Sequence, residues 1–301
     1  MTLWTLSLAM TRVRSPRRAA DFVLLTKPRV VLMVLVTTLV GFHIGSVGAP
    51  EPLRLLHALI GTGLAAAGAL ALNQFLERDV DGRMERTRRR PLPDKRLRPT
   101  EALYFGVALT VGGPTYLGLT TNWLSAAVVT ATAVSYLLAY TPLKRHSSLC
   151  TVLGAIPGAL PPVAGWAAAR GEFGLGAWVL FGILFLWQLP HTLAIAWVYR
   201  RDYARAGLRM LPVVDPEGAS TSRQVLINCL ALLAVGLLPS LVGMTGSVYF
   251  LGALLLGAGM LACGLGLAVT RSVGNARRLV YASIVYLPAL FILMAIDKIP
   301  F

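Results

Sequence analysis

Long apolar stretches separated by short polar breaks occupy most of the chain. Crossing about 30 Å of hydrocarbon takes about 20 helical residues, and nine stretches are long enough. They cover residues 28–47, 55–78, 101–120, 122–141, 148–169, 174–199, 224–243, 248–270 and 277–297. The turn around Thr121 and Asn122 is so short that it predicts a tight helical hairpin. The pattern therefore predicts an all-α fold, a polytopic membrane bundle of nine transmembrane helices.

The composition supports lipid as the main solvent of this chain. Of its 301 residues, 56% are hydrophobic and only 14% are charged. Soluble domains carry about 25% charged residues. With so little polar surface, a water-soluble globule of this size is excluded, and an integral membrane protein is expected.

The distribution of basic residues predicts the orientation in the membrane. All but three of the 28 Lys and Arg residues fall in alternate connections, the exceptions being Arg54, Arg170 and Lys298. Because Lys and Arg concentrate in cytoplasmic loops, the N-terminus is expected in the cytoplasm and the C-terminus outside. The formal charge of +15 thus follows the membrane topology, and no nucleic-acid partner is expected.

The spans leave no room for a soluble domain. Residues 1–27 are predicted to form a cytoplasmic N-terminal tail, and residues 28–301 a single transmembrane domain. The cytoplasmic loops at about 78–100 and 200–223 hold most of the remaining polar residues and are the expected catalytic loops.

Three polar residues form a ladder at the end of the second span. Asn73, Glu77 and Asp81 are spaced i, i+4, i+8, so they share one helical face and span about 12 Å. Mg2+ prefers oxygen ligands and is usually held by one or two carboxylates together with substrate phosphates. The ladder, followed by a run of arginines, predicts a metal–diphosphate site. Spacing alone also allows simple ion pairs between these carboxylates and Arg78 or Arg83.

The segment NQFLERDVDGRMERTRRRPLP, residues 73–93, resembles the first aspartate-rich motif of the UbiA superfamily of intramembrane prenyltransferases. Within that superfamily, it is most similar to the heme O synthase family. Four further blocks agree in order, at residues 25–29, 140–145, 154–166, and 187–191 together with 201–212. Quinone-type members carry a second Asp-x3-Asp ladder after the sixth helix. Here only Asp202 stands there, followed by Tyr203, so a second metal site is left open.

The resemblance implies nine helices around a central cavity and a specific reaction. A farnesyl group would pass from farnesyl diphosphate to a vinyl group of heme b, with addition of water, giving heme O and diphosphate for the terminal oxidases. Mg2+ is the implied cofactor, and heme b is a substrate rather than a cofactor. The implied location is the bacterial inner membrane, with the active site facing the cytoplasm. The implied partners are membrane lipid and both substrates, and heme A synthase or oxidase assembly factors are candidate recipients of the product.

The resemblance and the chemistry together predict the site residues. Those expected to hold Mg2+ are Asn73, Glu77, Asp81 and Asp202. Those expected to bind the diphosphate are Arg86, Arg90, Lys144 and Arg145. Tyr140 is expected to shield the allylic cation with its ring face. The residues expected at heme are His191, Tyr203 and Trp187.

For several of these residues, a structural or topological role is an open alternative to substrate binding. His191 follows Pro190 within a span, so it is either a heme contact or a histidine bonded to a freed carbonyl. Tyr and Trp near a membrane boundary are commonly interfacial anchors. Lys27 and Arg29 are expected mainly as topological charges, and a role at the substrate is the alternative. The rival functions are prenyl transfer to a quinone precursor or chlorophyllide and, more distantly, secondary transport, although no second copy of the ladder is present.

Overall fold

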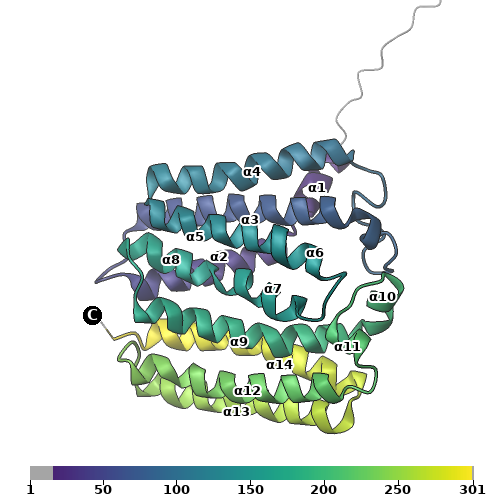
Figure 1. Cartoon of the computed structure of the whole chain (residues 1–301). Coiled ribbons are helices and arrows are strands. Elements are labelled where there is room, and N and C mark those ends of the chain that lie inside the picture. The colour runs from purple at the N-terminus through teal and green to yellow at the C-terminus, as the bar shows by residue number, and fades with distance from the viewer. Residues whose placement is uncertain (1–15, 300–301) are drawn as a thin grey trace, which may run out of the picture.

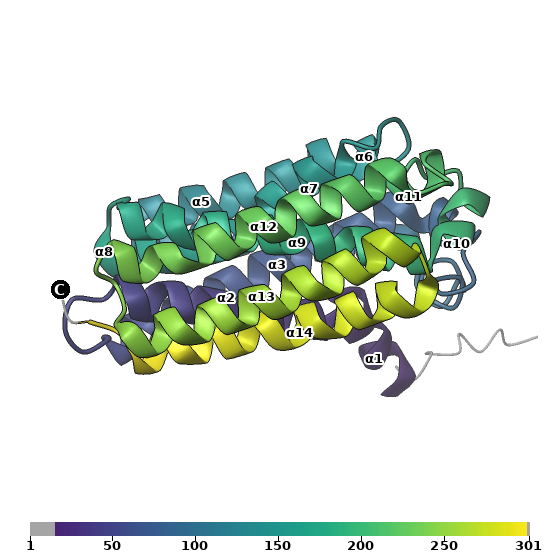
Figure 2. The same cartoon turned by 90° about the horizontal axis from the view of Figure 1, so that it is seen from below.

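The computed structural model describes residues 16–299, and these form an all-helical bundle whose long helices run side by side (Figures 1 and 2). The first half of the chain forms α1 (Pro16–Leu25), α2 (Pro28–Gly45), α3 (Pro52–Asp81), α4 (Pro99–Thr120), α5 (Trp123–Val134), η1 (Ser135–Tyr140) and α6 (Thr141–Leu143). It continues with α7 (Cys150–Ala159), α8 (Pro161–Arg170), α9 (Leu175–Val198), α10 (Arg200–Arg205), α11 (Leu211–Val214), α12 (Ala219–Leu241), α13 (Ser247–Thr270) and α14 (Val273–Ile296).

Nine segments of the described chain are long and apolar enough to cross a membrane, which confirms the predicted count. Most bounds agree with the prediction to within a few residues. The largest differences are α12, which begins five residues early at Ala219, and α3, which begins at Pro52 and ends at Asp81. Pro52 suits the first turn of a helix because its missing N–H has no helical partner there. At its other end, α3 carries the whole polar ladder inside regular helix.

Glycines allow the helices to approach closely where a side chain would collide. A Cβ on Gly165 of α8 would lie 2.0 Å from the backbone oxygen of Thr38 in α2. A Cβ on Gly68 of α3 would lie 2.4 Å from the backbone nitrogen of Thr110 in α4. Small residues of this kind let transmembrane helices associate through van der Waals packing. They fix α2, α3, α4 and α8 as one tightly packed half of the bundle.

Two of the spans are not continuous α-helices. The fourth passes from α5 into the π-helix η1 and then α6, and the Thr141 hydroxyl donates a 2.8 Å hydrogen bond to the Tyr136 carbonyl oxygen. The fifth changes from α7 to α8 at Leu160, directly before Pro161. Single-turn π-helices are frequent at functional sites because the wider turn re-aims the side chains that follow. Here it directs Tyr136 and Tyr140 inward.

A central cavity of about 250 Å3 lies between α2, α3, α5, η1, α7, α8 and α9. Its wall is mainly apolar and is rich in Ala and Gly, among them Ala65, Ala66, Ala69, Gly154 and Gly158. Ala69 lies one helical turn before Asn73, so the cavity begins directly beneath the ladder. The expectation of nine helices around a central cavity therefore agrees with the structure.

One end of the bundle gathers the polar connections. The loop after α3, the α6–α7 connection, α10 and α11 all lie at the right-hand end of Figure 1, whereas the C-terminal residues lie at the opposite end. We call the former the basic end, because residues 78–98, 144–145 and 200–209 supply most of its Lys and Arg. The α1 helix, which falls within the predicted tail 1–27, also lies there.

Candidate active site

The polar ladder is buried at the basic end of α3. Asn73 and Asp81 are each 1% exposed, and Glu77 is 8% exposed. Asp79, which points to another side of the helix, has a side chain that is 73% exposed. The helical spacing therefore predicted correctly which oxygen atoms face inward. Such buried carboxylates need cationic or metal partners, because an isolated buried charge is strongly disfavoured.

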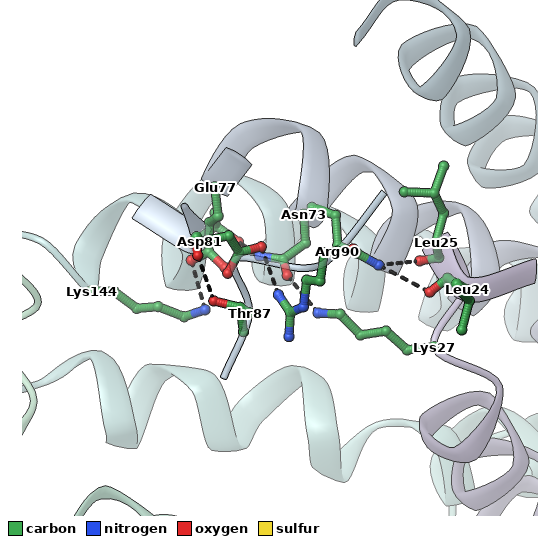
Figure 3. Close-up of polar contacts among 11 residues, drawn as sticks. Leu24, Leu25, Lys27, Asn73, Glu77, Asp81, Thr87, Arg90 and Lys144 are labelled. Atoms are coloured by element: carbon green, nitrogen blue, oxygen red, sulfur yellow. Dashed lines mark hydrogen bonds and ion pairs between the residues drawn. The ribbon is translucent and has the colours of Figure 1, made fainter. Parts of the chain in front are cut away.

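Each member of the ladder has its own cationic partner, and the three partners come from three different segments (Figure 3). Lys27 donates to the Asn73 Oδ1 at 2.9 Å. The closest pairs are charged ones, with Lys144 Nζ 2.7 Å from Glu77 Oε1 and an Arg90 guanidinium nitrogen 2.6 Å from Asp81 Oδ2. Lys27 and Lys144 are distant in sequence from their partners, whereas Arg90 follows Asp81 by nine residues. The simple ion-pair interpretation named Arg78 and Arg83, and neither pairs with Glu77 or Asp81 in the described chain.

Lys27 reaches the ladder from the turn between α1 and α2. It is the N-cap of α2 and adopts a left-handed backbone conformation, with φ of 50°. Gln74, the neighbour of Asn73, holds this turn by donating to the Leu25 carbonyl oxygen at 2.7 Å. Burial, together with the nearby charges of Arg90 and Lys144, lowers the pKa of Lys27 to about 7.

Lys144 reaches the ladder from the end of the fourth span. Its ammonium lies 4.3 Å from the centroid of the Tyr140 ring, which places it within cation–π range. Asn73 Nδ2 also donates to the Thr141 hydroxyl at 3.2 Å, so α3 holds this segment at two residues that follow Tyr140. Burial disfavours the charge of Lys144, but Tyr140 and Glu77 outweigh it and hold the pKa of Lys144 above its usual value.

Arg90 reaches the ladder from the loop that follows α3. Thr87 in this loop donates to the Asp81 carbonyl oxygen at 2.8 Å, which turns the chain back over the helix end. Further along, Arg96 forms an ion pair with Asp21 of α1. The loop is therefore a folded cover of the ladder, held at both ends, and not a solvated arginine run.

Asp202 lies in α10 and faces the same loop rather than the ladder. Its carboxylate accepts from the backbone N–H of Glu85 at 3.4 Å and of Arg86 at 3.5 Å, and it pairs with Arg205. Burial would raise its pKa, but these hydrogen bonds and the Arg205 charge lower the pKa of Asp202 below its usual value. Asp202 therefore docks α10 onto the loop in this structure.

Three other predicted residues lie around this docking region. Arg86 is exposed, and its guanidinium carbon lies 5.4 Å from the centroid of the Tyr199 ring. Tyr203 packs against a small buried cluster with Val80 and Met84. Arg145 is exposed, and its side chain contacts no polar or aromatic group within residues 16–299.

His191 and Trp187 lie on α9, one turn apart, and both bond to Ser283 of α14. Trp187 Nε1 donates to the Ser283 carbonyl oxygen at 2.8 Å, and its ring stacks on His191 with centroids 4.9 Å apart. His191 Nδ1 lies 2.6 Å from the Ser283 hydroxyl oxygen. That hydroxyl donates to the Val280 carbonyl at 2.7 Å, so it accepts from His191. His191 is therefore not bonded to a carbonyl freed by Pro190, and its Nε2 keeps a free lone pair.

The ladder has the chemistry of a site for a divalent cation and a diphosphate, although Glu77 and Asp81 have no third carboxylate, histidine or cysteine close to them among the described residues. Among the described residues, no group of three or more His, Cys, Asp or Glu side chains is close enough to hold a metal. Two carboxylates and an amide oxygen on one face still suit Mg2+ when phosphate oxygens complete its coordination. Lys27, Lys144 and Arg90 carry the positive charge that a diphosphate would need. The residues present therefore fit a metal–diphosphate group.

Some residues of the site could not be recognised from local sequence. Thr141, Thr87 and Gln74 position the ladder but belong to no charged pattern. Lys27 lies 46 residues before Asn73 and was expected mainly as a topological charge. The available signal was its place directly before Pro28 at the start of a buried span.

Comparison with known proteins places this geometry in a family. The UbiA prenyltransferase family model matches residues 34–294. A protoheme IX farnesyltransferase of Solibacter usitatus is 49% identical over 287 residues, covering 92% of this chain and 98% of that protein. A protoheme IX farnesyltransferase of Koribacter versatilis is 43% identical, covering 99% of each chain.

Solved structures show the same fold at low sequence identity. A digeranylgeranylglyceryl phosphate synthase superposes with a TM-score of 0.79 at 14% identity, covering 93% of this chain and 98% of that one. A UbiA homologue from Archaeoglobus fulgidus, bound to DMAPP and Mg2+, superposes with a TM-score of 0.64 at 15% identity, covering 92% and 99%. The expectation drawn from the motifs is thus confirmed: this chain is an integral membrane prenyltransferase and belongs to the UbiA prenyltransferase family.

Proposed function

We propose that this prenyltransferase transfers the farnesyl group of farnesyl diphosphate to a vinyl group of heme b, with addition of water, giving heme O and diphosphate. The observation that carries the proposal is the ladder with its three cations, placed at the mouth of an apolar cavity. The named activity of relatives at 49% and 43% identity supports heme as the acceptor.

The ladder would hold Mg2+ through Asn73, Glu77 and Asp81. When bound, Mg2+ would neutralise charge that develops on the departing diphosphate. Glu77 and Asp81 would bind the metal in place of their present cationic partners, and Lys144 and Arg90 would then be available to bind diphosphate oxygens. Arg90 suits this role because its guanidinium matches a phosphate bidentately. Arg86, Arg145 and Asp202 were also predicted here, and their exposure or separate docking contacts favour an outer position around the bound diphosphate.

The cavity beneath the ladder would receive the farnesyl chain. Its alanines and glycines leave a space lined by apolar groups that suits an isoprenoid hydrocarbon. Tyr136 and Tyr140 line the cavity next to the ladder, with ring centroids 5.5 Å apart. In this proposal their faces would lie beside the allylic carbon as positive charge develops on it, since an aromatic face stabilises a nearby cation.

The heme would contact α9 at His191. The Ser283 hydroxyl oxygen accepts a hydrogen bond from the Nδ1–H of His191, so the neutral imidazole presents its Nε2 lone pair. This arrangement is usual for a histidine that binds a metal. Trp187 stacks on the ring and fixes its plane. We assign Tyr203 to the packing of the loop, since it contacts the buried cluster around Met84.

The biological setting forms part of the proposal. With the basic end in the cytoplasm, a soluble diphosphate headgroup reaches the ladder while the farnesyl chain stays within the bilayer. We place residues 28–301, as one catalytic domain, in a bacterial inner membrane, making heme O for terminal oxidases. Heme A synthase or an oxidase assembly factor would receive the product.

The test uses membranes that contain the full-length chain, supplied with heme b, farnesyl diphosphate and Mg2+. Wild type is expected to form heme O, identified by chromatography and mass spectrometry, and Asp81→Ala is expected to lose this activity at limiting Mg2+. His191→Ala should weaken heme binding and spare farnesyl diphosphate binding. Prenylation of a hydroxybenzoate in place of heme would instead favour a quinone-type acceptor.

A further inference from the structure

Two polar side chains that α9 contributes to the wall of the apolar cavity have no hydrogen-bond partner in the part of the chain that the structure describes. Gln188 and Thr192 lie one turn apart on α9, and both line the cavity. Neither side chain makes a hydrogen bond to any residue in the described range 16–299. The neighbouring Trp187 Nε1 and His191 Nδ1, in contrast, both bond to Ser283 of α14.

The Gln188 amide lies in space that is available because Gly158 has no side chain. A Cβ on Gly158 of α7 would lie 2.2 Å from the Gln188 Oε1 and 2.3 Å from its Nε2. The amide therefore fills the space that a side chain at position 158 would occupy. The α7 residue one turn earlier is Gly154, where a Cβ would lie 2.5 Å from the Tyr140 ring. Gln188 thus lies about one helical turn, roughly 5–6 Å, from Tyr140 along the cavity wall.

An unpaired amide in this position needs a polar ligand. Leaving such a group without a hydrogen bond in an apolar cavity costs about 1–3 kcal/mol in mutational data. A farnesyl chain is a hydrocarbon and offers it nothing. An ordered water molecule does, because it can bind two to four polar groups at once, and Gln188 with Thr192 provides three.

We propose that Gln188 and Thr192 hold the water molecule that adds to the prenylated heme. This inference rests on the proposed farnesyl transfer and deepens it. Loss of diphosphate from the allylic carbon and attack by the vinyl CH2 carbon form one carbon–carbon bond and leave a cation on the carbon next to the porphyrin. The water oxygen forms a bond to that carbon and releases one proton, which the departing diphosphate takes up. The product carries a hydroxyl group.

Without a positioned water, the same cation has a different fate. It loses a proton from the neighbouring CH2 group, which forms a carbon–carbon double bond and gives a product lighter by one water molecule. The amide of Gln188 does not take up a proton itself, so it acts as a positioning residue. The ratio of hydroxylated to dehydrated product reports this role directly, and a change in folding or in total activity does not move it.

The experiment measures that ratio by mass spectrometry in membranes supplied with heme b, farnesyl diphosphate, Mg2+ and isotopically labelled water. Wild type is expected to give the hydroxylated product with the label in its hydroxyl group. Gln188→Met keeps the side-chain length and removes the amide, and it should lower the ratio about tenfold, the effect of one lost hydrogen bond. Thr192→Val should lower it less. Thr130→Val, which removes a hydroxyl from the lipid-facing side of α5, should leave it unchanged.

Gly158→Ala provides an independent variant, since its methyl group displaces the amide without deleting it and should shift the ratio in the same direction. An unchanged ratio in both Gln188→Met and Gly158→Ala, with prenylated heme still formed, would overturn the assignment. Lower heme affinity with an unchanged product would assign Gln188 to the porphyrin instead. If wild type forms no prenylated heme at all, the proposed function fails, and this result differs from either of the others.

Discussion

Replacing Lys144 by methionine should strengthen Mg2+ binding and weaken diphosphate binding. In the structure, Lys144 forms an ion pair with Glu77, and its Nζ lies 2.7 Å from the Glu77 Oε1. A metal that binds Glu77 must first displace this ammonium, so the lysine competes with Mg2+ for the same oxygen. With the metal bound, Lys144 would be available as a ligand of the diphosphate in the proposed mechanism. Removing it therefore has opposite effects on the two ligands.

The expected magnitude follows from the burial of the pair. The side chains of Lys144 and Glu77 are 13% and 11% exposed. Removing one partner of a fully buried pair costs about 3–5 kcal/mol, whereas an exposed pair contributes about 0–1 kcal/mol. For this intermediate case we take about 2 kcal/mol, which corresponds to about 30-fold tighter Mg2+ binding. Loss of one charged hydrogen bond to the diphosphate, about 1.5–3 kcal/mol, should weaken its binding by about 10–100-fold.

Isothermal titration calorimetry of the purified chain in detergent measures both constants, first for Mg2+ alone and then for farnesyl diphosphate at saturating Mg2+. Lys95→Met removes an exposed lysine from the same end of the bundle and controls for the change in net charge. Glu77→Gln should weaken Mg2+ binding. The double variant Glu77→Gln with Lys144→Met should bind Mg2+ no more tightly than Glu77→Gln alone, because the lysine affects the metal only through Glu77. Weaker or unchanged Mg2+ binding in Lys144→Met alone would refute this account of the ladder.

Three further predictions concern the parts that surround the ladder. Gly165→Val should lower the free energy of unfolding, measured by thermal denaturation, by about 3 kcal/mol, because a Cβ there would lie 2.0 Å from a backbone oxygen of α2. Gly112→Val should change this free energy little, because a Cβ at Gly112 would meet only open space. Thr87→Val should cost about 1 kcal/mol through its lost hydrogen bond to the end of α3. The pKa of Asp202 is lower in the folded chain, so in acid the unfolded chain binds more protons at this group. The docking of α10 onto the loop should therefore be constant at neutral pH and weaken as the pH falls below about 4. Hydrogen exchange of the loop should show this pH dependence in wild type and not in Asp202→Asn.

The inward face of α3 was predictable because it depends on helical geometry alone. The i, i+4, i+8 spacing of the ladder needs no knowledge of the neighbouring helices, and burial of 1%, 8% and 1% for Asn73, Glu77 and Asp81 agrees with it. The nine spans were predictable for a similar reason, since hydropathy over about 20 residues measures transfer into lipid. Both are properties of single helices.

The partners of the ladder were not predictable in the same way, because they depend on how helices pack. Lys144 reaches Glu77 only after η1 has added a wider turn to the fourth span, and no hydropathy pattern distinguishes a π-helix from an α-helix. His191 bonds to Ser283, which lies 92 residues away and carries no charge to mark it. Asp202 was expected at the metal, and its contacts to the loop come from a docking that only the tertiary structure shows.

The origin of the three cations links diphosphate binding to closure of the basic end. Lys27 belongs to the turn before α2, Arg90 to the loop after α3, and Lys144 to the segment after α6, and each segment is held to α3 partly through its cation. If the three cations bound one metal–diphosphate group, they would exchange three separate contacts to α3 for contacts to one shared ligand. The three segments would then be held together over the mouth of the cavity. Closure of this kind would exclude bulk water from the allylic cation, and the water held by Gln188 inside the cavity would be the one that reacts.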